Sequence, residues 1–278
     1  FSGCDNLTEI VFNGKLENWF NIHFTLFNYL LNNAKNLYIG GENIANATLI
    51  IPKTVTEINE NVFSGFKGLT SIVISSNVLS VGKFAFSDCV NLSKVVFEEE
   101  SQLTSIGDAA FNSSGVINIE LPSSVTYIGD GAFNYCYDLT NIILPDTLLD
   151  LGANMFVRCK NLQYVQLPSV IESIPDSMFL DCGSLTFIEL PKTVVTIKNS
   201  AFRYCTNLAK IELPSVLTNI GEYAFESCRN LYEIINNSDL PLKIGNQDYG
   251  QIAYNAKAII DKNGNRTYKD GVSNFEYI

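Results

Sequence analysis

The chain has a single histidine among its 278 residues, and its 18 basic side chains are outnumbered by 29 acidic ones. With His23 as the only imidazole, a Ser-His-Asp or Cys-His nucleophile system is almost impossible to assemble, and a packed or surface histidine is the simpler interpretation. A net charge of -11 without a Lys/Arg cluster disfavours binding to nucleic acid. No apolar run approaches the roughly 20 residues that span a bilayer, so we expect no membrane insertion within this chain.

Sequence motifs for cofactors and metals are also missing. There is no Gly-x-x-x-x-Gly-Lys phosphate loop and no Cys-x-x-Cys pair, so we expect no cofactor. The stretch 261–265 resembles the start of a calcium loop, but the distal carboxylate is missing and a hairpin turn is the preferred interpretation. The acidic run at 98–100 is interpreted as a solvated loop rather than a cation site. These absences predict that the chain is not an enzyme.

A repeat with a fixed period dominates the sequence. Five phenylalanines fall 23 residues apart and each is followed three residues later by a cysteine: Phe133/Cys136, Phe156/Cys159, Phe179/Cys182, Phe202/Cys205 and Phe225/Cys228. The same column continues upstream at Phe1, Phe63, Phe86 and Phe111, with two extra residues at 98–100 and one missing near Gly115. Such a period predicts a solenoid, in which each coil buries its apolar side only by stacking on its neighbours.

Each repeat reads Leu-x-x-Ile-x-Leu-Pro-x-x-Val-x-x-Ile-Gly-x-x-Ala-Phe-x-x-Cys. The Ile-x-Leu pair has the two-residue alternation of a strand with one buried face. Proline lacks a backbone donor and should end the strand. The next apolar pair predicts a brief extended segment on the opposite wall, and the Gly-x-x-Ala-Phe stretch predicts one helical or turn-like step.

The seven cysteines are expected to be packed rather than chemical. Five of them are one period apart, so their side chains should point in parallel, which is poor geometry for a disulfide. Phe66 and Ser114 replace cysteine in two coils, which favours a packing role over a redox role. We therefore predict reduced thiols that behave as small apolar residues.

The repeats predict about ten coils of 23 residues over residues 1–235. Residues 13–46 interrupt them as an insertion, with a short amphipathic helix at 16–20 and a strand at 36–39. Either this insertion shields the first coil or the chain is a fragment. Residues 236–278 are expected to form a C-terminal capping segment, because the Asn-Gly pair at 263–264 between extended runs favours a β-hairpin.

The repeat closely resembles that of the BspA-like leucine-rich repeat family over about residues 1–12 and 47–235. This resemblance implies a right-handed superhelix with a parallel β-sheet on its concave face and short extended or helical-turn segments on its convex side. It also implies an extracellular or cell-surface protein of host-associated microbes, used in adhesion or host contact. The resemblance implies no catalytic residues for this chain, and a shared scaffold does not identify the ligand.

The outward positions of the strands supply the candidate binding residues. They flank the buried Ile and form two columns across the concave face. Exposed aromatic residues ringed by polar ones are typical of binding hot spots, although β-propensity alone also places such residues on strands. The candidates are Ile143, Tyr164, Gln166, Phe187, Glu189, Lys210 and Glu212.

Three functions remain open at this point. The leading hypothesis is a noncatalytic recognition scaffold that binds a protein or glycan, possibly host-derived, through the concave face. A second is a structural spacer that holds other modules away from the envelope. A third is the repeat portion of a larger modular enzyme.

Overall fold

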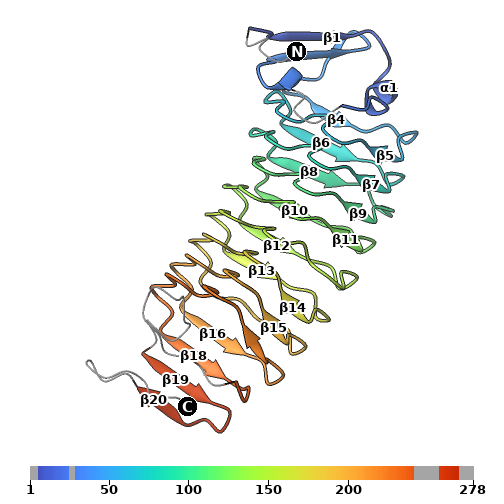
Figure 1. The fold of residues 1–278 in the computed structure, drawn as a ribbon. Coiled ribbons are helices and arrows are strands. Elements are labelled where there is room, and N and C mark those ends of the chain that lie inside the picture. Colours follow the sequence, from blue (N-terminus) through green and yellow to red (C-terminus); the bar gives the residue numbers. More distant parts are fainter. Residues whose placement is uncertain (1–5, 25–28, 241–256, 269–278) are drawn as a thin grey trace.

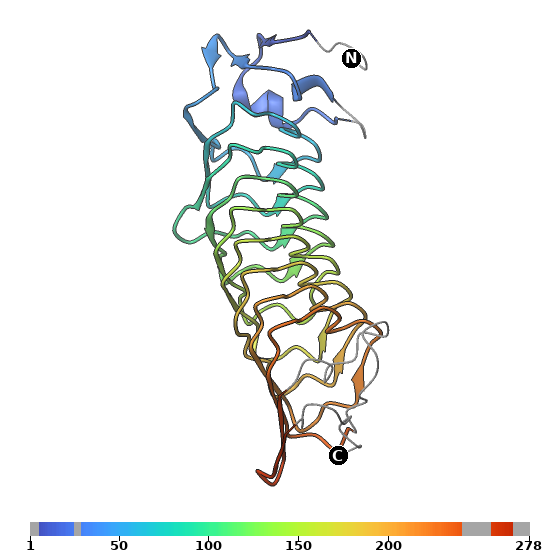
Figure 2. The same cartoon turned by 90° about the vertical axis from the view of Figure 1, so that its left-hand side faces the viewer.

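The chain forms an elongated stack of about ten coils, seen in a computed structural model that describes residues 6–24, 29–240 and 257–268 (Figure 1). Figure 2 shows the coils lying one above another from the N-terminal to the C-terminal end. Each coil has three walls: a strand, a second and shorter extended segment, and a turn around the repeated phenylalanine. The predicted solenoid built on a parallel sheet is therefore confirmed.

The first wall is a parallel sheet to which successive coils contribute one strand each. In it the buried residue of each strand pairs with that of the next, as Ile142 does with Ile119 and with Val165. The strands end where prolines were expected to end them, and the Leu148 amide then donates to the Pro145 carbonyl (3.1 Å) in a turn. The six-stranded part of this sheet contains β4 (Thr48–Ile50), β6 (Ser71–Ile74), β8 (Lys94–Phe97), β10 (Asn118–Glu120), β12 (Asn141–Ile143) and β13 (Tyr164–Gln166).

The first wall is interrupted after β13. Residues 187–189, the next member of the column, belong to no strand, so the expectation of a strand in every coil is wrong here. Ile188 is nevertheless buried between exposed Phe187 and Glu189, which keeps the alternation of faces because the core still requires the isoleucine. The wall resumes as β16 (Lys210–Leu213), β18 (Glu233–Asn236), β19 (Ala258–Asp261) and β20 (Arg266–Tyr268).

The second wall consists of two-residue parallel strands. The glycine that follows several of them is needed for close approach of neighbouring backbones: a Cβ on Gly129, which follows β11, would lie 2.5 Å from the backbone nitrogen of Asp108. These strands are β5 (Glu57–Ile58), β7 (Ser80–Val81), β9 (Ser105–Ile106) and β11 (Tyr127–Ile128) in one sheet, and β14 (Ser173–Ile174), β15 (Thr196–Ile197) and β17 (Asn219–Ile220) in another.

The third wall is a turn rather than a helical step, and its backbone forms a hydrogen-bonded ladder of its own. Two residues per coil are left-handed, two positions before and two after the phenylalanine, as Gly131 (φ 62°) and Tyr135 (φ 57°) are around Phe133. The amides of these three residues donate to the carbonyls of Ala153, Met155 and Val157 in the next coil (2.8, 3.1 and 2.7 Å). The same three bonds recur in every coil from Asn61 to Tyr204. The ladder therefore has a direction, with all its donors facing the C-terminal end.

The phenylalanine column forms the centre of the core. From Phe63 to Phe225 the rings stack on one another with centroids 5.2 to 6.0 Å apart. Beside them the thiols donate across coils, as Cys159 Sγ does to the Phe133 carbonyl oxygen (3.1 Å). The six described cysteines, Cys89 to Cys228, are buried, as predicted, and those from Cys89 to Cys205 form no disulfide. Phe1 and Cys4 lie outside the described residues.

One three-stranded sheet and two short helices precede the regular coils. The predicted helix and strand of the insertion are present as α1 (Leu16–Phe20) and β2 (Asn36–Ile39). β2 pairs with β1 (Glu9–Phe12) and β3 (Glu42–Asn43), and a short 3-10 helix, η1, covers Tyr29–Leu31. Trp19 and Phe20 pack on Phe63 (centroids 6.3 and 5.7 Å apart), and Trp19 Nε1 donates to the Val62 carbonyl oxygen (3.2 Å). In later coils that carbonyl position accepts a ladder bond, so the indole replaces a donor that a preceding coil would supply.

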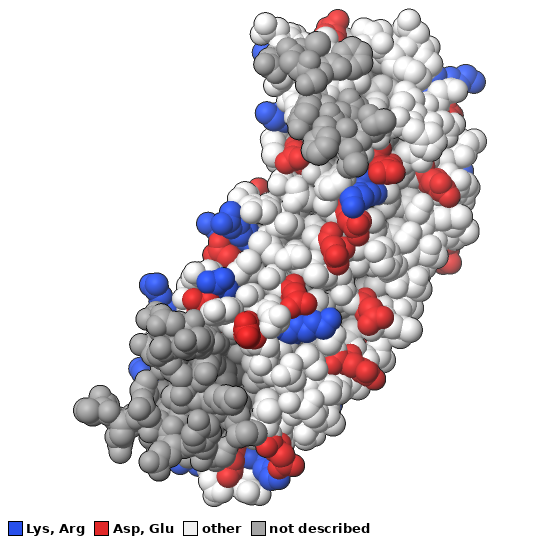
Figure 3. Space-filling view, in the orientation of Figure 1, with Lys and Arg blue, Asp and Glu red and all other residues white. Residues whose placement is uncertain are grey.

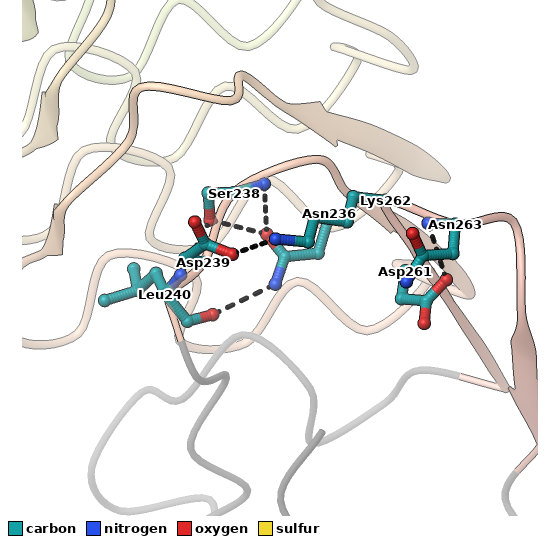
Figure 4. A network of polar contacts seen from close by, with 7 residues as sticks. All are labelled: Asn236, Ser238, Asp239, Leu240, Asp261, Lys262 and Asn263. Atoms are coloured by element: carbon teal, nitrogen blue, oxygen red, sulfur yellow. Dashed lines mark hydrogen bonds and ion pairs between the residues drawn. The ribbon is translucent and has the colours of Figure 1, made fainter.

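The hairpin β19–β20 closes the sheet at the other end. β19 pairs in parallel with β18 and so adds a strand beyond Leu231, where the sequence pattern dissolves, and β20 covers its edge antiparallel. Figure 4 shows the contacts between these turns. The Asn236 side chain accepts a hydrogen bond from the Ser238 amide and donates one to the Leu240 carbonyl oxygen, while Lys262 in the hairpin turn forms an ion pair with Asp239.

Candidate recognition face

The strand face, defined here as the outward side chains of the first wall, carries a group of exposed apolar residues. Ile143, Tyr164 and Phe187 are 54%, 49% and 50% exposed. Ile143 and Tyr164 lie on the adjacent strands β12 and β13, and Phe187 occupies the position of Tyr164 one coil further on. The structure thus places the three predicted apolar candidates on one face, in consecutive coils.

The polar candidates divide into free and engaged groups. Gln166 lies within 3.4 Å of the Tyr164 hydroxyl, and Glu189 is exposed beside Phe187. Lys210 instead forms an ion pair with Glu233 (3.0 Å). Glu212 accepts a hydrogen bond from Asn237 Nδ2 (2.9 Å). The C-terminal part of the predicted patch is therefore tied into the sheet by polar contacts, and its apolar centre is not.

A hollow of about 930 Å³ opens on the strand face over β10 and β12. Of the seven predicted residues only Ile143 lines it. The sequence analysis did not select Glu120, an outward residue of β10, or Asp146, which lies in the turn after the strand-ending proline. The lining residues are Asn118–Leu121, Ser123, Asn141–Ile143 and Pro145–Thr147.

The hollow borders the place where the repeat loses its register. From Lys94 to Asn118 the step is 24 residues, because two residues are added at 98–100 and one is lost near Gly115. β8 consequently pairs with β10 through the single pair Lys94 and Asn118, whereas β10 and β12 share three. The extra residues fold back, and the Glu98 carboxylate accepts the Ser76 amide (3.1 Å). The pairing of β8 with β10 is therefore looser than that of β10 with β12, and the hollow lies beside this junction.

Acidic groups outnumber basic ones over the middle of the view in Figure 3. Glu120 and Asp146 line the hollow itself, and Asp146 Oδ1 accepts the Ser169 amide (2.7 Å). Among the residues that the structure describes, no Lys, Arg or His lies within 4 Å of the carboxylates of Glu120, Asp146 or Glu189. The hollow therefore combines an apolar floor with negative charge at its rim.

A second, polar hollow of about 390 Å³ lies between the insertion and the second wall. It is lined by His23, which is exposed. Of the two expected positions for this histidine, packed or on the surface, the structure shows the second. Glu17 of α1 and Glu57 of β5 both line this hollow. The other residues that line it include Thr54 and Thr56 but no cysteine.

The loop at 261–265 uses its carboxylate to hold a turn. Asp261 Oδ1 accepts the amides of Asn263 (2.9 Å) and Asn265 (2.8 Å), and Oδ2 accepts the Asn265 side chain (2.8 Å). These hydrogen bonds, led by that of the Asn265 side chain, lower the pKa of Asp261. The described ranges contain no group of three or more His, Cys, Asp or Glu side chains placed to hold a metal ion. Nor does any helix in them have the length and apolar character needed to cross a membrane.

These features define a leucine-rich repeat solenoid of the parallel-sheet kind. The family model described as the BspA type leucine rich repeat region, in six copies, matches residues 35–163 and 126–251. The chain therefore belongs to the BspA-type leucine-rich repeat family.

Solved structures agree on the fold. The chain is similar to a leucine-rich repeat protein of T. pallidum, with 23% identity and a TM-score of 0.51 over 66% of this chain and 77% of that one. It is also similar to a leucine-rich repeat protein of Eubacterium ventriosum, with 20% identity and a TM-score of 0.50 over 67% of this chain and 59% of the other. At these identities the likeness concerns the fold alone. No curated protein matches the chain.

Proposed function

We propose that the chain is a noncatalytic recognition scaffold, acting at the cell surface or outside the cell, that binds a protein or glycan through its strand face. The observation that supports this most strongly is the group Ile143, Tyr164 and Phe187, three large apolar side chains about half exposed in consecutive coils. Family membership supports the location and the absence of chemistry, because BspA-type repeats form a scaffold rather than an active site.

The rigidity of the scaffold supports binding through these side chains. Buried Ile142, Val165 and Ile188 alternate with the exposed residues, so the backbone beneath the patch is fixed by the core. Tyrosine and other large aromatic residues on a preorganised surface lose little conformational freedom when a partner covers them. They are accordingly the residues that dominate the energy of many interfaces.

A binding screen against host matrix proteins and glycans tests the proposal. For any ligand found, the double variant Tyr164→Ala, Phe187→Ala should remain folded, because both side chains are exposed, and should lose at least about tenfold in affinity. The matched control is Tyr127→Ala with Leu149→Ala, which removes two exposed side chains of similar size (53% and 70% exposed) away from the first wall. Unchanged affinity in the first double variant would reject this patch.

A spacer is the second candidate, and the continuous core favours it. The phenylalanine stack runs without a gap from Phe63 to Phe225. A spacer needs such a continuous core, because it has to hold other modules at a fixed distance. The same screen separates the two functions. Silence across the whole panel would favour the spacer, and a saturable ligand that is lost with Tyr164 and Phe187 would favour recognition.

A further inference from the structure

We propose that the hollow beside Ile143 receives an extended protein segment with two basic side chains that flank an apolar one. The inference rests on the proposed function, because it names the class of partner that the strand face would bind. The hollow has the size of a site for a large side chain and its neighbours, about 930 Å³, and its floor includes Ile143, Leu121 and Pro145.

The charges around the hollow call for a cationic partner. Glu120 and Glu189 are exposed, and no basic side chain of the described residues lies within 4 Å of either carboxylate. Glu233 on the same wall is by contrast neutralised, since it contacts both Lys210 (3.0 Å) and Arg266 (3.5 Å). Negative charge left without a partner beside an apolar floor is complementary to Lys or Arg next to an aliphatic residue.

The spacing of the column specifies the arrangement of that partner. Glu120, Ile143 and Gln166 lie on adjacent paired strands, and Glu189 follows one period later. At a strand separation of about 4.8 Å, the two glutamates lie about 14 Å apart. An extended segment advances about 3.4 Å per residue, so its side chains at i and i+4 point the same way and are also about 14 Å apart. The side chain at i+2 then lies over Ile143 and Gln166.

The polar groups of the hollow argue against a glycan as the occupant. The Asn118 side-chain oxygen already accepts hydrogen bonds from Thr140 Oγ1 (2.8 Å) and from Asn141 Nδ2 (3.3 Å). Asn141 Nδ2 also donates to Thr140 Oγ1 (3.0 Å). These contacts occupy the Asn118 side-chain oxygen and the Asn141 side-chain nitrogen, which a sugar hydroxyl would otherwise use. The carboxylates and the apolar floor remain available, and they suit a basic and apolar peptide.

The test uses the whole chain, isotope-labelled, and a capped peptide Gly-Lys-Thr-Leu-Thr-Lys-Gly followed by amide chemical shifts. We expect saturable binding with a Kd of about 1 mM or tighter, shifts centred on β10 to β13, and weakening as salt rises. Glu120→Gln and Glu189→Gln should each weaken binding about two- to fivefold. Ile143→Ser should weaken it by at least about fivefold. A peptide with Glu in place of both Lys should not bind.

Matched variants distinguish binding at the hollow from nonspecific electrostatic or hydrophobic binding elsewhere on the surface. Ile50→Ser removes an equally exposed isoleucine (59%) from the same column on β4, and Glu222→Gln removes an exposed acid from the third wall. Both should leave the Kd unchanged. No saturable peptide binding, equal binding of the acidic peptide, or equal effects of Ile50→Ser and Ile143→Ser would overturn the inference. If the screen finds a ligand dependent on Tyr164 and Phe187 while the peptide fails, only this inference falls. If both fail, the proposed function falls with it.

Discussion

The buried thiols predict an unusual sensitivity of the fold to alkaline pH. Burial raises the pKa of Cys136 from its ordinary value of 9.0 to about 12, and it raises that of Cys228 to about 12 as well. The pKa values of Cys159, Cys182 and Cys205 are raised well above 9.0 by the same cause, and that of Cys89 is raised too. A thiol that is harder to ionise when folded binds its proton more tightly in the native state. Its contribution is therefore complete below pH 9 and is lost as the pH rises from 9 toward the folded pKa.

The expected loss is large because six thiols act together. At pH 10 each unfolded thiol gains between 1 and 2 kcal/mol by ionising, so the six together destabilise the fold by about 8 kcal/mol relative to pH 8. That amount is comparable with the whole stability of an ordinary domain, roughly 5–15 kcal/mol. The chain should accordingly be folded at pH 8 and begin to unfold near pH 10.

Alkylation followed by mass spectrometry measures the effect thiol by thiol. At pH 8 the six buried cysteines of the folded chain should react at least about a thousandfold more slowly than in denaturant, since only the thiolate attacks. The control combines Cys159→Ala, Cys182→Ala and Cys205→Ala, which should halve the loss of stability between pH 8 and pH 10 measured by denaturant titration. Equal pH dependence in the two proteins, or rapid alkylation of the folded chain, would refute the argument.

Two further predictions concern the core and its N-terminal end. Phe179→Ala should destabilise the chain by about 3–5 kcal/mol, because it opens a gap in the ring stack. Phe187→Ala, on the strand face, should change stability by less than about 1 kcal/mol. Equal effects in denaturant titration would contradict the assignment of these residues to core and surface. Trp19→Phe keeps an aromatic ring against Phe63 but leaves the Val62 carbonyl without its donor, at a loss of about 1 kcal/mol. Hydrogen exchange should then quicken at residues 48–66 and stay unchanged around Phe179; unchanged exchange in the first region would show that the indole does not close the stack.

Most of the scaffold could be predicted from the sequence because it depends on local rules repeated at one period. The Phe-x-x-Cys column identified the core, the prolines identified the strand ends, and the alternation at 141–143 and 164–166 assigned Ile143 and Tyr164 to the outer surface. Each of these follows from side-chain size or backbone chemistry at a single position. The helix at 16–20 was also predictable, since a short amphipathic run between two strands has few alternatives.

Features that arise between coils could not be predicted. Left-handed backbone at Phe84, Tyr135 and Tyr204 contradicts the usual preference for glycine, because the ladder to the next coil imposes it. The hollow over β10 and β12 is lined by residues of two coils, and it lies next to the change of register between β8 and β10. The sequence marked the change at 98–100, but the consequence for side chains on neighbouring strands appears only when the coils are stacked.

The direction of the third-wall ladder explains why stability and recognition are separated in this fold. Because three amides of that wall in each coil donate to the next coil, stacking is maintained by backbone groups, by the ring column and by the thiols, none of which faces outward from the strands. The N-terminal end presents acceptors, and Trp19 meets one of them with a side chain. The outward side chains of Glu120, Ile143 and Phe187 are exposed and lie outside the core, so these three positions can differ from coil to coil without loss of fold. Binding sites should therefore be sought where that freedom coincides with a break in the period, and the hollow beside Ile143 is such a place.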